Sequence, residues 1–339
     1  MVTLNDVAKA AGVTPSAVSY ALSGKGTLSM ATRTRILTCA SELGYRPNLV
    51  ARGLATQQSH TIGLLVADIA NPFYGIVAQT VERTAYRYGY RAFMVDCDRN
   101  EHLARELLAD LTARRVDGIV AMPGGFAAEV IRSTIPPSMP IVWCMWEDED
   151  PDLTPLVGLD YYTGGKLAAE HLLELGHRHI AILTHHNKPG ANVYEHRLRV
   201  AGCRDALASA GVPLDSSLLA LGDSSVESGI AAGRSLLSRS DPPTAVFATN
   251  DLMALGLLAA AHEAGIPVPA ALSIVGFDDI VSSAFSGPPL TTVRIDCAGM
   301  MAGAVMLLLD LIQGRKPVPP PISIPTLIVR RSTGPAPAA

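Results

Sequence analysis

From residue 61 onward, short apolar runs alternate with longer amphipathic stretches, and this alternation constrains the fold more than any other feature of the chain. Runs such as 61–67 and 245–248 are predicted to be buried strands, and the stretches between runs carry apolar residues at helical spacing. A repeated strand–helix alternation is typical of α/β folds with parallel sheets. Because the alternation starts again at 156–159, the sequence predicts two doubly wound parallel-sheet lobes.

The order of the predicted elements indicates that the chain crosses between the lobes near its end. Helix 298–312 is expected to return to the first lobe and strand 326–329 to the second. The tail at 333–339, rich in proline and alanine, is expected to be flexible. The predicted strands are 61–67, 91–95, 118–122, 141–146, 156–159, 180–183, 245–248, 273–275 and 326–329.

Polar and aromatic residues stand at the carboxyl ends of the predicted strands, where open α/β sheets bind their ligands. Aromatic faces stack on sugar C–H groups, and fixed carboxylates and amides take the hydroxyls, so the set favours a sugar. A helix N-cap is the alternative for each Asp or Asn, and Asp160 and Asn250 suit it well. The residues are Asp68, Asn71, Phe73, Tyr74, Trp146, Asp160, Asn250, Asp251, Asp278 and Asp279.

The first 46 residues show a different pattern, which predicts three helices and no strand. Thr3 and Asp6 have the spacing of a capping box, and Gly12 is placed to end the first helix. Thr14 can cap a second helix and Ser29 a third. Two short helices joined by a tight bend and braced by a third form a helix-turn-helix. The apolar positions of the third helix, expected to be buried, are Ile36, Leu37, Ala40 and Leu43.

In a helix-turn-helix, the second helix presents its N-terminal residues to the major groove of DNA. The exposed face of that helix carries Pro15, Ser16, Ser19 and Tyr20. We take Pro15, Ser16 and Tyr20 as candidates for contact with base edges. The alternative is a small helical interaction module whose hydroxyls are solvated. Candidates for phosphate contact are Ser19, the cap hydroxyls of Thr3, Thr14 and Ser29, and the basic residues Lys25 and Arg33.

The charge is unevenly distributed along the chain. Residues 1–60 hold six Lys or Arg and two acidic residues, a net charge of +4, whereas the remainder holds 21 basic and 29 acidic residues, a net charge of −8. A basic segment attached to an acidic body suits a module that meets DNA phosphates while the rest stays off the duplex.

Several other classes of function are disfavoured. No apolar run reaches the roughly 18 residues of a membrane span, and the N-terminus does not resemble a signal peptide. Five widely spaced cysteines without a CxxC pair are expected to be reduced, buried thiols of a cytoplasmic protein. His177 and His179 would share one side of a strand, but no acidic or Cys ligand completes a metal site. We therefore expect no metal, no cofactor and no catalytic residues, since nucleotide and hydrolase motifs are also lacking.

The segment TLNDVAKAAGVTPSAVS at 3–19 closely resembles the opening of regulators of the lactose-repressor (LacI/GalR) family. GYRPN at 44–48 and ARGL at 51–54 resemble it too, and the likeness extends to about residue 332. Pro15 and Tyr20 are atypical of familiar members, so no operator sequence is inferred. The resemblance implies a DNA-binding domain at 1–46, a hinge at 47–59 and a periplasmic-binding-protein-like effector and dimerisation domain at 60–332. Within the last domain, one lobe is expected at about 60–160 and 293–323, and the other at about 161–292 and 324–332.

The hinge is expected to contain a short helix capped by Asn48, with Arg52 placed for a phosphate. The resemblance implies that this helix orders on DNA and that Leu54 is wedged into the minor groove. A helix of about eight residues is marginal in water, so its order would depend on a partner. An inserted apolar side chain kinks the duplex at a base step. The alternative is a flexible linker in which Leu54 is an ordinary buried leucine.

The resemblance also selects among the strand-end residues. It implies effector binding foremost by Arg199, Asn250 and Asp278, and next by Asp160, Phe73, Tyr74 and Trp146. Five guanidinium donors and a carboxylate match the geometry of vicinal hydroxyls. Purine-binding members lack an Asn at the position of Asn250, which favours a carbohydrate.

The predicted function is therefore a cytoplasmic, non-enzymatic repressor that binds operator DNA as a homodimer and is gated by a small-molecule effector, expected to be a sugar. The C-terminal tail cannot form an apolar heptad, so no tetramer-forming helix is expected. Two rivals remain: a periplasmic sugar-binding protein, and a sugar-converting enzyme in which Asp160, Asp278 and Asp279 supply an acid–base pair. Induction and corepression are equally open.

Overall fold

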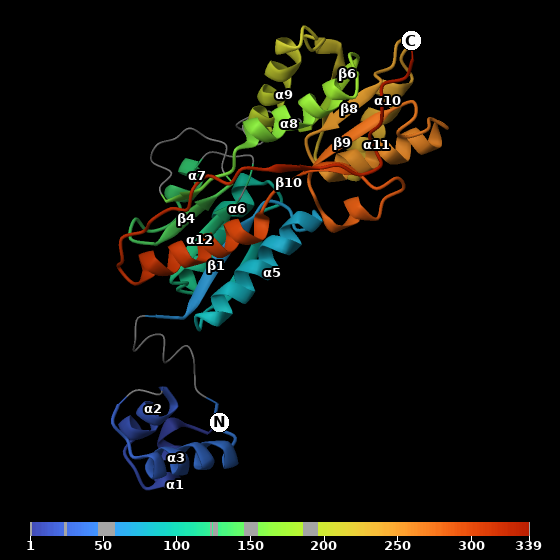
Figure 1. Ribbon diagram of the computed structural model, residues 1–339. Coiled ribbons are helices and arrows are strands. Elements are labelled where there is room, and N and C mark those ends of the chain that lie inside the picture. Colours follow the sequence, from blue (N-terminus) through green and yellow to red (C-terminus); the bar gives the residue numbers. More distant parts are fainter. Residues whose placement is uncertain are drawn as a thin grey trace. The chain divides into compact units, whose positions relative to one another are not determined.

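The computed structural model describes residues 2–23, 26–46, 58–122, 124, 128–145, 155–185 and 196–338. They fall into two compact units, Met1–His60 and Thr61–Ala339. The first unit contains helices, and the second contains helices and two sheets (Figure 1).

The small unit consists of α1 (Leu4–Ala11), α2 (Pro15–Ser23) and α3 (Met30–Glu42), as predicted. The Thr3 hydroxyl accepts a hydrogen bond from the Asp6 amide at 3.3 Å, and the Asp6 carboxylate accepts one from the Thr3 amide at 2.8 Å. This capping box begins α1, and Gly12 at φ +61° ends it. The core of the unit consists of Val7, Ala8, Ala11, Val18, Ala21, Ile36 and Ala40.

The predicted buried stripe of the third helix is only half right. Ile36 and Ala40 are buried, but Leu37 is 43% exposed and Leu43 is 39% exposed. Leu37 lies about 100° around the helix from Ile36 and about 60° from Ala40, at the edge of the buried face of α3. Leu43 is the C-cap residue of α3, where the helix ends.

The sheet of the first lobe has five parallel strands in the order β2-β1-β3-β4-β5. Its side chains alternate between two faces, as strand geometry requires. Leu64 and Val66 belong to the hydrophobic cluster of α5 (Pro72–Arg87) and α12 (Cys297–Ile312), whereas Leu65 belongs to that of α6 (Glu101–Ala113) and α7 (Ala128–Arg132). The strands are β1 (Thr61–Val66), β2 (Arg91–Asp96), β3 (Gly118–Met122), β4 (Ile141–Cys144) and β5 (Leu156–Val157).

The sheet of the second lobe has six strands in the order β11-β10-β9-β8-β6-β7, all parallel except the edge strand β11. One face packs against α8 (Tyr161–Glu174) and α9 (Arg197–Ser209), and the other against α10 (Val226–Leu237) and α11 (Asp251–Glu263). The strands are β6 (Ile180–His185), β7 (Leu219–Gly222), β8 (Ala245–Ala248), β9 (Ser273–Asp278), β10 (Thr291–Arg294) and β11 (Thr326–Ile328), and two 3₁₀ helices, η1 (Ser216–Leu218) and η2 (Val281–Ala284), lie between them.

Strand β7 was not among the predicted strands. It is a four-residue edge strand that pairs with β6; Leu221 is 54% exposed and Gly222 is buried. Its sequence, LALG, is too short to show a period of two or a buried run. Pairing with β6, rather than a local pattern, therefore defines it.

The two lobes confirm the predicted α/β architecture, and the chain crosses between them more than once. After β10 in the second sheet, α12 packs on α5 and β4 of the first lobe, and β11 then returns to the second sheet, as expected. A bridge joins Leu159 to Ser323, and one hydrophobic cluster runs through both lobes. In the described part of the chain no helix is both long and apolar enough to span a membrane.

The end of the chain is held by hydrogen bonds, in contrast to the flexible tail expected from residue 333. The Gly334 carbonyl lies 3.1 Å from Nε2 of the buried His177, and the Ala336 amide donates to the Leu175 carbonyl at 2.8 Å. The Gly334 amide donates to the Ser273 hydroxyl at 3.1 Å. Composition alone suggested a free tail, whereas polar groups of the second lobe bind its backbone.

Candidate functional site

The predicted DNA-reading face of α2 is exposed. Pro15, Ser16 and Ser19 are solvent-accessible, and Tyr20 is 51% exposed, whereas Val18 of the same helix is buried. The Tyr20 ring lies against Gly26, where an added Cβ would come within 3.1 Å of Cγ of the ring. Gly26 has φ +80°, a conformation that glycine adopts without strain. The helix therefore presents side chains that the core does not use.

The hydroxyl candidates for phosphate contact cap the helices. Thr14 Oγ1 accepts from the Ala17 amide at 3.2 Å, and Ser29 Oγ accepts from the Thr32 amide at 3.1 Å. Thr3 Oγ1 also donates to the Asp6 carboxylate at 2.7 Å, and these bonds to Thr3 lower the pKa of Asp6. All three hydroxyl residues are exposed, so capping accounts for their presence while leaving them at the surface.

The remaining DNA-binding candidates divide into two groups. Arg33 is half-buried on α3. Lys25 and the hinge residues Asn48, Arg52 and Leu54 lie outside the described residues, so their predicted roles remain predictions.

Arg199 is the centre of the second candidate site. It is buried on α9, and its guanidinium carbon lies 4.1 Å from the Phe277 ring centroid and 4.7 Å from that of Tyr161. Nη1 donates to the Thr249 carbonyl at 2.5 Å and lies 3.9 Å from Oδ1 of Asp278. Cation–π contacts, a hydrogen bond and a long ion pair thus orient one guanidinium.

The position of α9 depends on its close approach to α8. A Cβ on Gly165 of α8 would lie 1.9 Å from the Arg199 carbonyl oxygen, and a Cβ on Gly202 of α9 would lie 1.9 Å from that of Tyr162. Both contacts are far shorter than van der Waals distance, so only glycine fits at either crossing point. The two glycines therefore bring the backbone of Arg199 against α8.

Asp278 lies on a strained turn at the end of β9. Its φ is +114° and that of Asp279 is +57°, both unusual for a residue with a side chain. Asp279 accepts from Arg294 Nε and Arg330 Nη2, each at 2.6 Å. Such outliers persist where surrounding contacts over-determine the backbone, and functional sites are enriched in them.

Asn250 and Asp160 occupy the N-cap positions of α11 and α8. Asn250 Oδ1 accepts from the Met253 amide at 2.9 Å, and Asp160 Oδ1 accepts from the Thr163 amide at 2.9 Å. The N-cap alternative considered from the sequence is therefore realised for both residues. Any contact with an effector would be additional to capping.

Phe73 and Tyr74 are buried in the first turn of α5, with ring centroids 5.3 Å apart in an edge-to-face arrangement. They belong to the same hydrophobic cluster as Tyr161 and Phe277 of the second lobe. Trp146 lies outside the described residues. Arg199, Asp278 and Asn250 thus lie on the second lobe, whereas Phe73 and Tyr74 lie on the first.

Four further residues lie beside Arg199 and Asn250, and the sequence analysis assigned none of them to effector binding. Tyr161 and Phe277 flank the guanidinium, and the two histidines His185 and His196 lie with ring centroids 5.4 Å apart. Burial, followed by the positive charges of Arg199, His185 and Arg99, holds the pKa of His196 well below its usual value. The spacing of His196, three residues before Arg199 on a predicted helix, was the available signal.

Asp251 is the other buried carboxylate at these strand ends. It accepts from the Ser283 hydroxyl at 2.6 Å, the Thr292 hydroxyl at 2.5 Å and the Ile280 amide at 2.9 Å. Burial raises its pKa to about 6, against the opposing effect of these hydrogen bonds. The contacts join α11 to η2 and β10, which is a structural role.

The carboxylates named for an acid–base pair are engaged elsewhere. Asp160 caps α8, Asp279 joins two arginines, and Asp278 lies beside Arg199. His177, considered as a metal ligand, is buried between Thr244 and Ser273, with ring nitrogens 2.9 Å from each hydroxyl. Among the described residues no group of three or more His, Cys, Asp or Glu could hold a metal ion.

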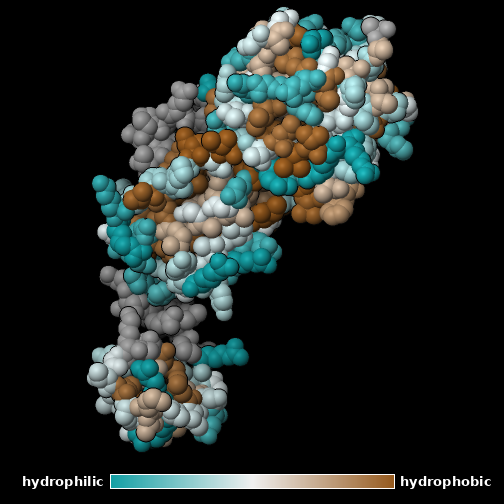
Figure 2. All heavy atoms as spheres, in the orientation of Figure 1, coloured by the Kyte–Doolittle hydropathy of each residue, from teal (hydrophilic) through white to brown (hydrophobic). Residues whose placement is uncertain are grey.

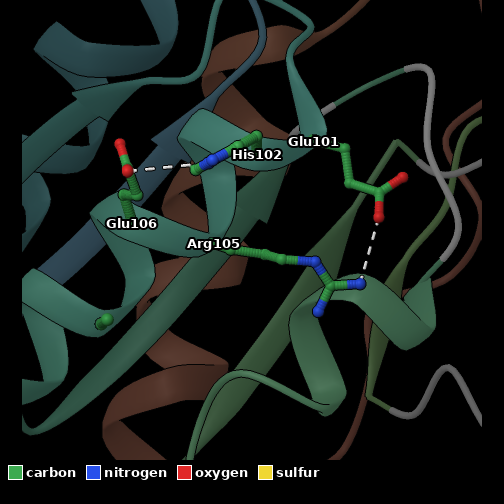
Figure 3. Close-up of a pocket in the computed structure, with 5 residues that line it drawn as sticks. Glu101, His102, Arg105 and Glu106 are labelled. Carbon is green, nitrogen blue, oxygen red and sulfur yellow. Dashed lines mark hydrogen bonds and ion pairs between the residues drawn. The ribbon is translucent and has the colours of Figure 1, made fainter.

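A surface hollow on α6 is unrelated to these residues. It is lined by Glu101, His102, Arg105, Glu106 and Ala109 (Figure 3). The Glu101–Arg105 and His102–Glu106 pairs, at 3.1 and 3.6 Å, have the i,i+4 spacing of exposed pairs that stabilise helices weakly.

Two family profiles match the chain. Residues 3–48 match that of bacterial regulatory proteins of the lacI family, and residues 169–333 match a periplasmic binding protein-like domain. The first match covers all three helices of the small unit, and the second covers most of the second lobe and the crossovers.

Curated relatives match over most of their length. Catabolite control protein A of Priestia megaterium is 35% identical over 307 residues, 91% of each chain. The transcriptional regulator DegA of Bacillus subtilis is 35% identical over 343 residues, 98% of each chain. The ribose operon repressor of Escherichia coli is 34% identical over 298 residues, 87% of this chain and 88% of that one.

Solved structures of transcriptional regulators are also similar to this chain over most of its length. The lac repressor dimer bound to operator and the anti-inducer ONPF has a TM-score of 0.87 and 29% identity, with 98% of this chain and 99% of that chain covered. The complex of the transcriptional regulator CelR with cellobiose has a TM-score of 0.73 and 28% identity, with 98% and 100% covered. This chain belongs to the LacI family of bacterial transcriptional regulators.

Proposed function

We propose that this protein is a sequence-specific transcriptional repressor that binds operator DNA through α2 and releases or binds it in response to a small sugar. The observation that carries the proposal is that one chain combines an exposed α2 face with a buried Arg199–Asp278 site on a separate α/β unit. The first supplies DNA contacts and the second supplies ligand contacts. A protein acting on chromosomal DNA works in the cytoplasm.

Base reading falls to Pro15, Ser16 and Tyr20. Tyr20 has a hydroxyl that donates or accepts and a ring that packs on a thymine methyl group. Ser19 and the cap residues contribute phosphate contacts, together with Lys25 and Arg33. In the hinge, Asn48 caps a helix, Arg52 meets a phosphate and Leu54 is inserted into the minor groove.

A sugar suits the polar groups of the second lobe. The guanidinium of Arg199 and the carboxylate of Asp278 offer donors and acceptors for adjacent hydroxyls. Asn250 and Asp160 add acceptors, and Phe73, Tyr74 and Trp146 offer apolar ring faces. One relative is a ribose operon repressor and another regulator of similar structure was solved with cellobiose, which supports this class of ligand.

We further propose that the protein acts as a homodimer. Figure 2 shows apolar patches on the larger unit, and in η2 and just after it Val281 is 67% exposed and Phe285 is 82% exposed. Large exposed apolar side chains are typical of subunit interfaces. A two-fold dimer carries two reading helices and recognises a pseudo-palindromic site.

The test combines DNA binding and ligand binding. Fragments of the source genome are selected with the full-length protein, and the bound site is titrated by mobility shift at several salt concentrations. D-ribose, cellobiose, other mono- and disaccharides and purine bases are then added. We expect a salt-sensitive preference for one pseudo-palindrome, and a sugar that raises Tm and changes operator affinity.

Each failure has a distinct meaning. A sugar that binds without any DNA preference would indicate a transport-type binding protein. Conversion of the sugar during prolonged incubation would indicate an enzyme. Stabilisation by purines alone would contradict the carbohydrate proposal and leave the repressor proposal standing.

The hinge is tested separately. Leu54→Ala should weaken operator binding by about 1–3 kcal/mol and leave the sugar-induced rise in Tm unchanged, because an inserted side chain contributes only on DNA. Unchanged operator affinity would exclude the wedge.

A further inference from the structure

Two histidines that belong to no predicted site lie beside the candidate effector residues. His185 ends β6 and His196 is the N-cap residue of α9, and their ring centroids are 5.4 Å apart with planes tilted by 36°. His196 is buried and makes no side-chain capping bond to its helix. Helix capping therefore does not explain it.

His196 supports Arg199 through Thr249. His196 Nδ1 lies 2.5 Å from the Thr249 hydroxyl. The carbonyl of the same Thr249 accepts the hydrogen bond from Arg199 Nη1. Because Thr249 is fully buried and bonds to both side chains, a shift of its backbone moves the acceptor that orients the guanidinium.

His185 supports Asn250 in the same manner, through Ser224. His185 Nδ1 lies 3.0 Å from the Ser224 hydroxyl, and the Ser224 carbonyl accepts from Asn250 Nδ2 at 3.0 Å. Ser224 is buried with φ +74°, a conformation that its neighbours must impose. Each imidazole is thus one residue removed from an effector candidate.

The charges around the pair favour neutral rings. Burial is the main cause that lowers the pKa of His196. The charges of Arg199 on α9, His185 on β6 and Arg99 in the turn after β2 lower it further. The Asp278 carboxylate lies 3.9 Å from Nη1 of Arg199. A proton on His196 would place a third cation beside two arginines.

We propose that His185 and His196 are positioning residues that hold Asn250 and Arg199 in their effector-binding geometry, and that protonation of His196 weakens effector binding at acidic pH. This inference rests on the proposed sugar site. The Thr249 hydroxyl donates to Thr184 Oγ1 at 3.4 Å, so Nδ1–H of His196 donates to the Thr249 hydroxyl. A proton gained on the other ring nitrogen adds a positive charge beside Arg199, and the repulsion displaces the guanidinium from the Thr249 carbonyl. The affinity is expected to fall by up to about tenfold for each pH unit below the pKa of His196.

The first experiment needs no ligand. Full-length protein with labelled His and Arg is titrated from pH 7.5 to 5 by NMR, following the His196 ring and the Nε–H signal of Arg199, which Arg199→Lys identifies. We expect both to shift with one midpoint, below the pH at which an ordinary histidine titrates. The amide of Asn places a hydrogen-bonding atom near the position of His196 Nδ1 but does not titrate. In His196→Asn the chemical shift of Arg199 Nε–H should therefore stay constant at all pH values. His102→Asn, on the exposed face of α6, should behave as wild type.

The second experiment measures affinity. D-ribose and cellobiose are titrated calorimetrically at pH 7.5 and 5.5 into wild type, His196→Asn and His102→Asn. For a sugar that binds, we expect weaker binding at pH 5.5 in wild type and in His102→Asn, and equal affinity at both pH values in His196→Asn.

The outcomes separate the two proposals. A sugar that binds with the same pH profile in wild type and His196→Asn overturns this inference and leaves the proposed function intact. An Arg199 signal that ignores the His196 titration overturns it without any ligand. If the Arg199 signal follows His196 while no sugar of any kind binds, the positioning stands and the sugar site fails.

Discussion

The DNA-reading face of α2 and the Arg199 cluster of the second lobe place functional residues in opposite physical situations. Pro15, Ser16 and Tyr20 are exposed, and the core of their unit consists of other residues. Arg199 and Asn250 are buried and hydrogen-bonded to the backbone that surrounds them. Function and stability are thus separable in the first region, whereas the same bonds serve both in the second.

The largest expected effect is that of Arg199→Ala. It removes the bond to Thr249, two cation–π contacts and the ion pair with Asp278, so the free energy of unfolding should fall by about 2–4 kcal/mol. Urea denaturation measures this loss, and the Tm response to sugars should vanish. Arg204→Ala, exposed on the same helix, should stay within about 0.5 kcal/mol of wild type. An Arg199→Ala protein of unchanged stability would contradict the conclusion that the bonds of Arg199 serve both stability and function.

Tyr20→Ala should show the opposite separation. Operator affinity should drop by about 1–3 kcal/mol, the range for one good base contact, at almost constant unfolding free energy. Mobility-shift titration and thermal melting provide the two measurements. Met30→Ala, which truncates an 85% exposed side chain of α3, is the control. Equal losses of stability and affinity would show that Tyr20 serves the fold.

Between pH 7.5 and 5.5, acid should destabilise the larger unit through its buried histidines. Burial lowers the pKa of His171, His177 and His196, so below about pH 6.5 the unfolded chain binds more protons and stability falls. The slope is at most ~1.4 kcal/mol per pH unit for each histidine. Asp251, with its pKa raised to about 6, acts in the opposite sense as the pH drops below 6.

Urea titrations at pH 7.5, 6.5 and 5.5 test this expectation, and His177→Asn should flatten the profile. The helices α1 to α3 contain no histidine, so operator-domain unfolding should not respond through this route. A small unit that loses stability in parallel with the large one would contradict the assignment to buried histidines.

The smallest effect distinguishes capping from phosphate contact at Ser29. Ser29→Ala should destabilise the small unit by about 1 kcal/mol, because the Thr32 amide loses its acceptor. Ser29→Asp should restore the cap and still weaken operator binding, since a carboxylate repels phosphate. Thermal melting and mobility shift distinguish these results. If Ser29→Asp bound DNA as wild type does, Ser29 would be a cap only.

The fold could be predicted wherever a local pattern matched a local structure. The alternation of buried runs and amphipathic helices revealed both lobes, and the Thr3 and Ser29 caps marked where helices begin. Prediction failed for β7, which is defined by its pairing with β6 and has no recognisable sequence pattern of its own. It also failed at Leu37 and Leu43, whose exposure depends on which face of α3 the small core covers. The bound tail at Gly334 depends on His177, more than 150 residues away along the chain.

For the candidate site, the sequence by itself determined which residue types stand at the strand ends, because capping, turn and strand signals are local. Only the tertiary structure decided that Arg199 lies between the Tyr161 and Phe277 rings, and that His185 and His196 support its neighbours. Those contacts join elements far apart in the chain, and they form only when helices α8 and α9 approach closely enough for Gly165 and Gly202 to meet backbone oxygens. Local propensity carries no information about such an approach, since it is set by long-range packing.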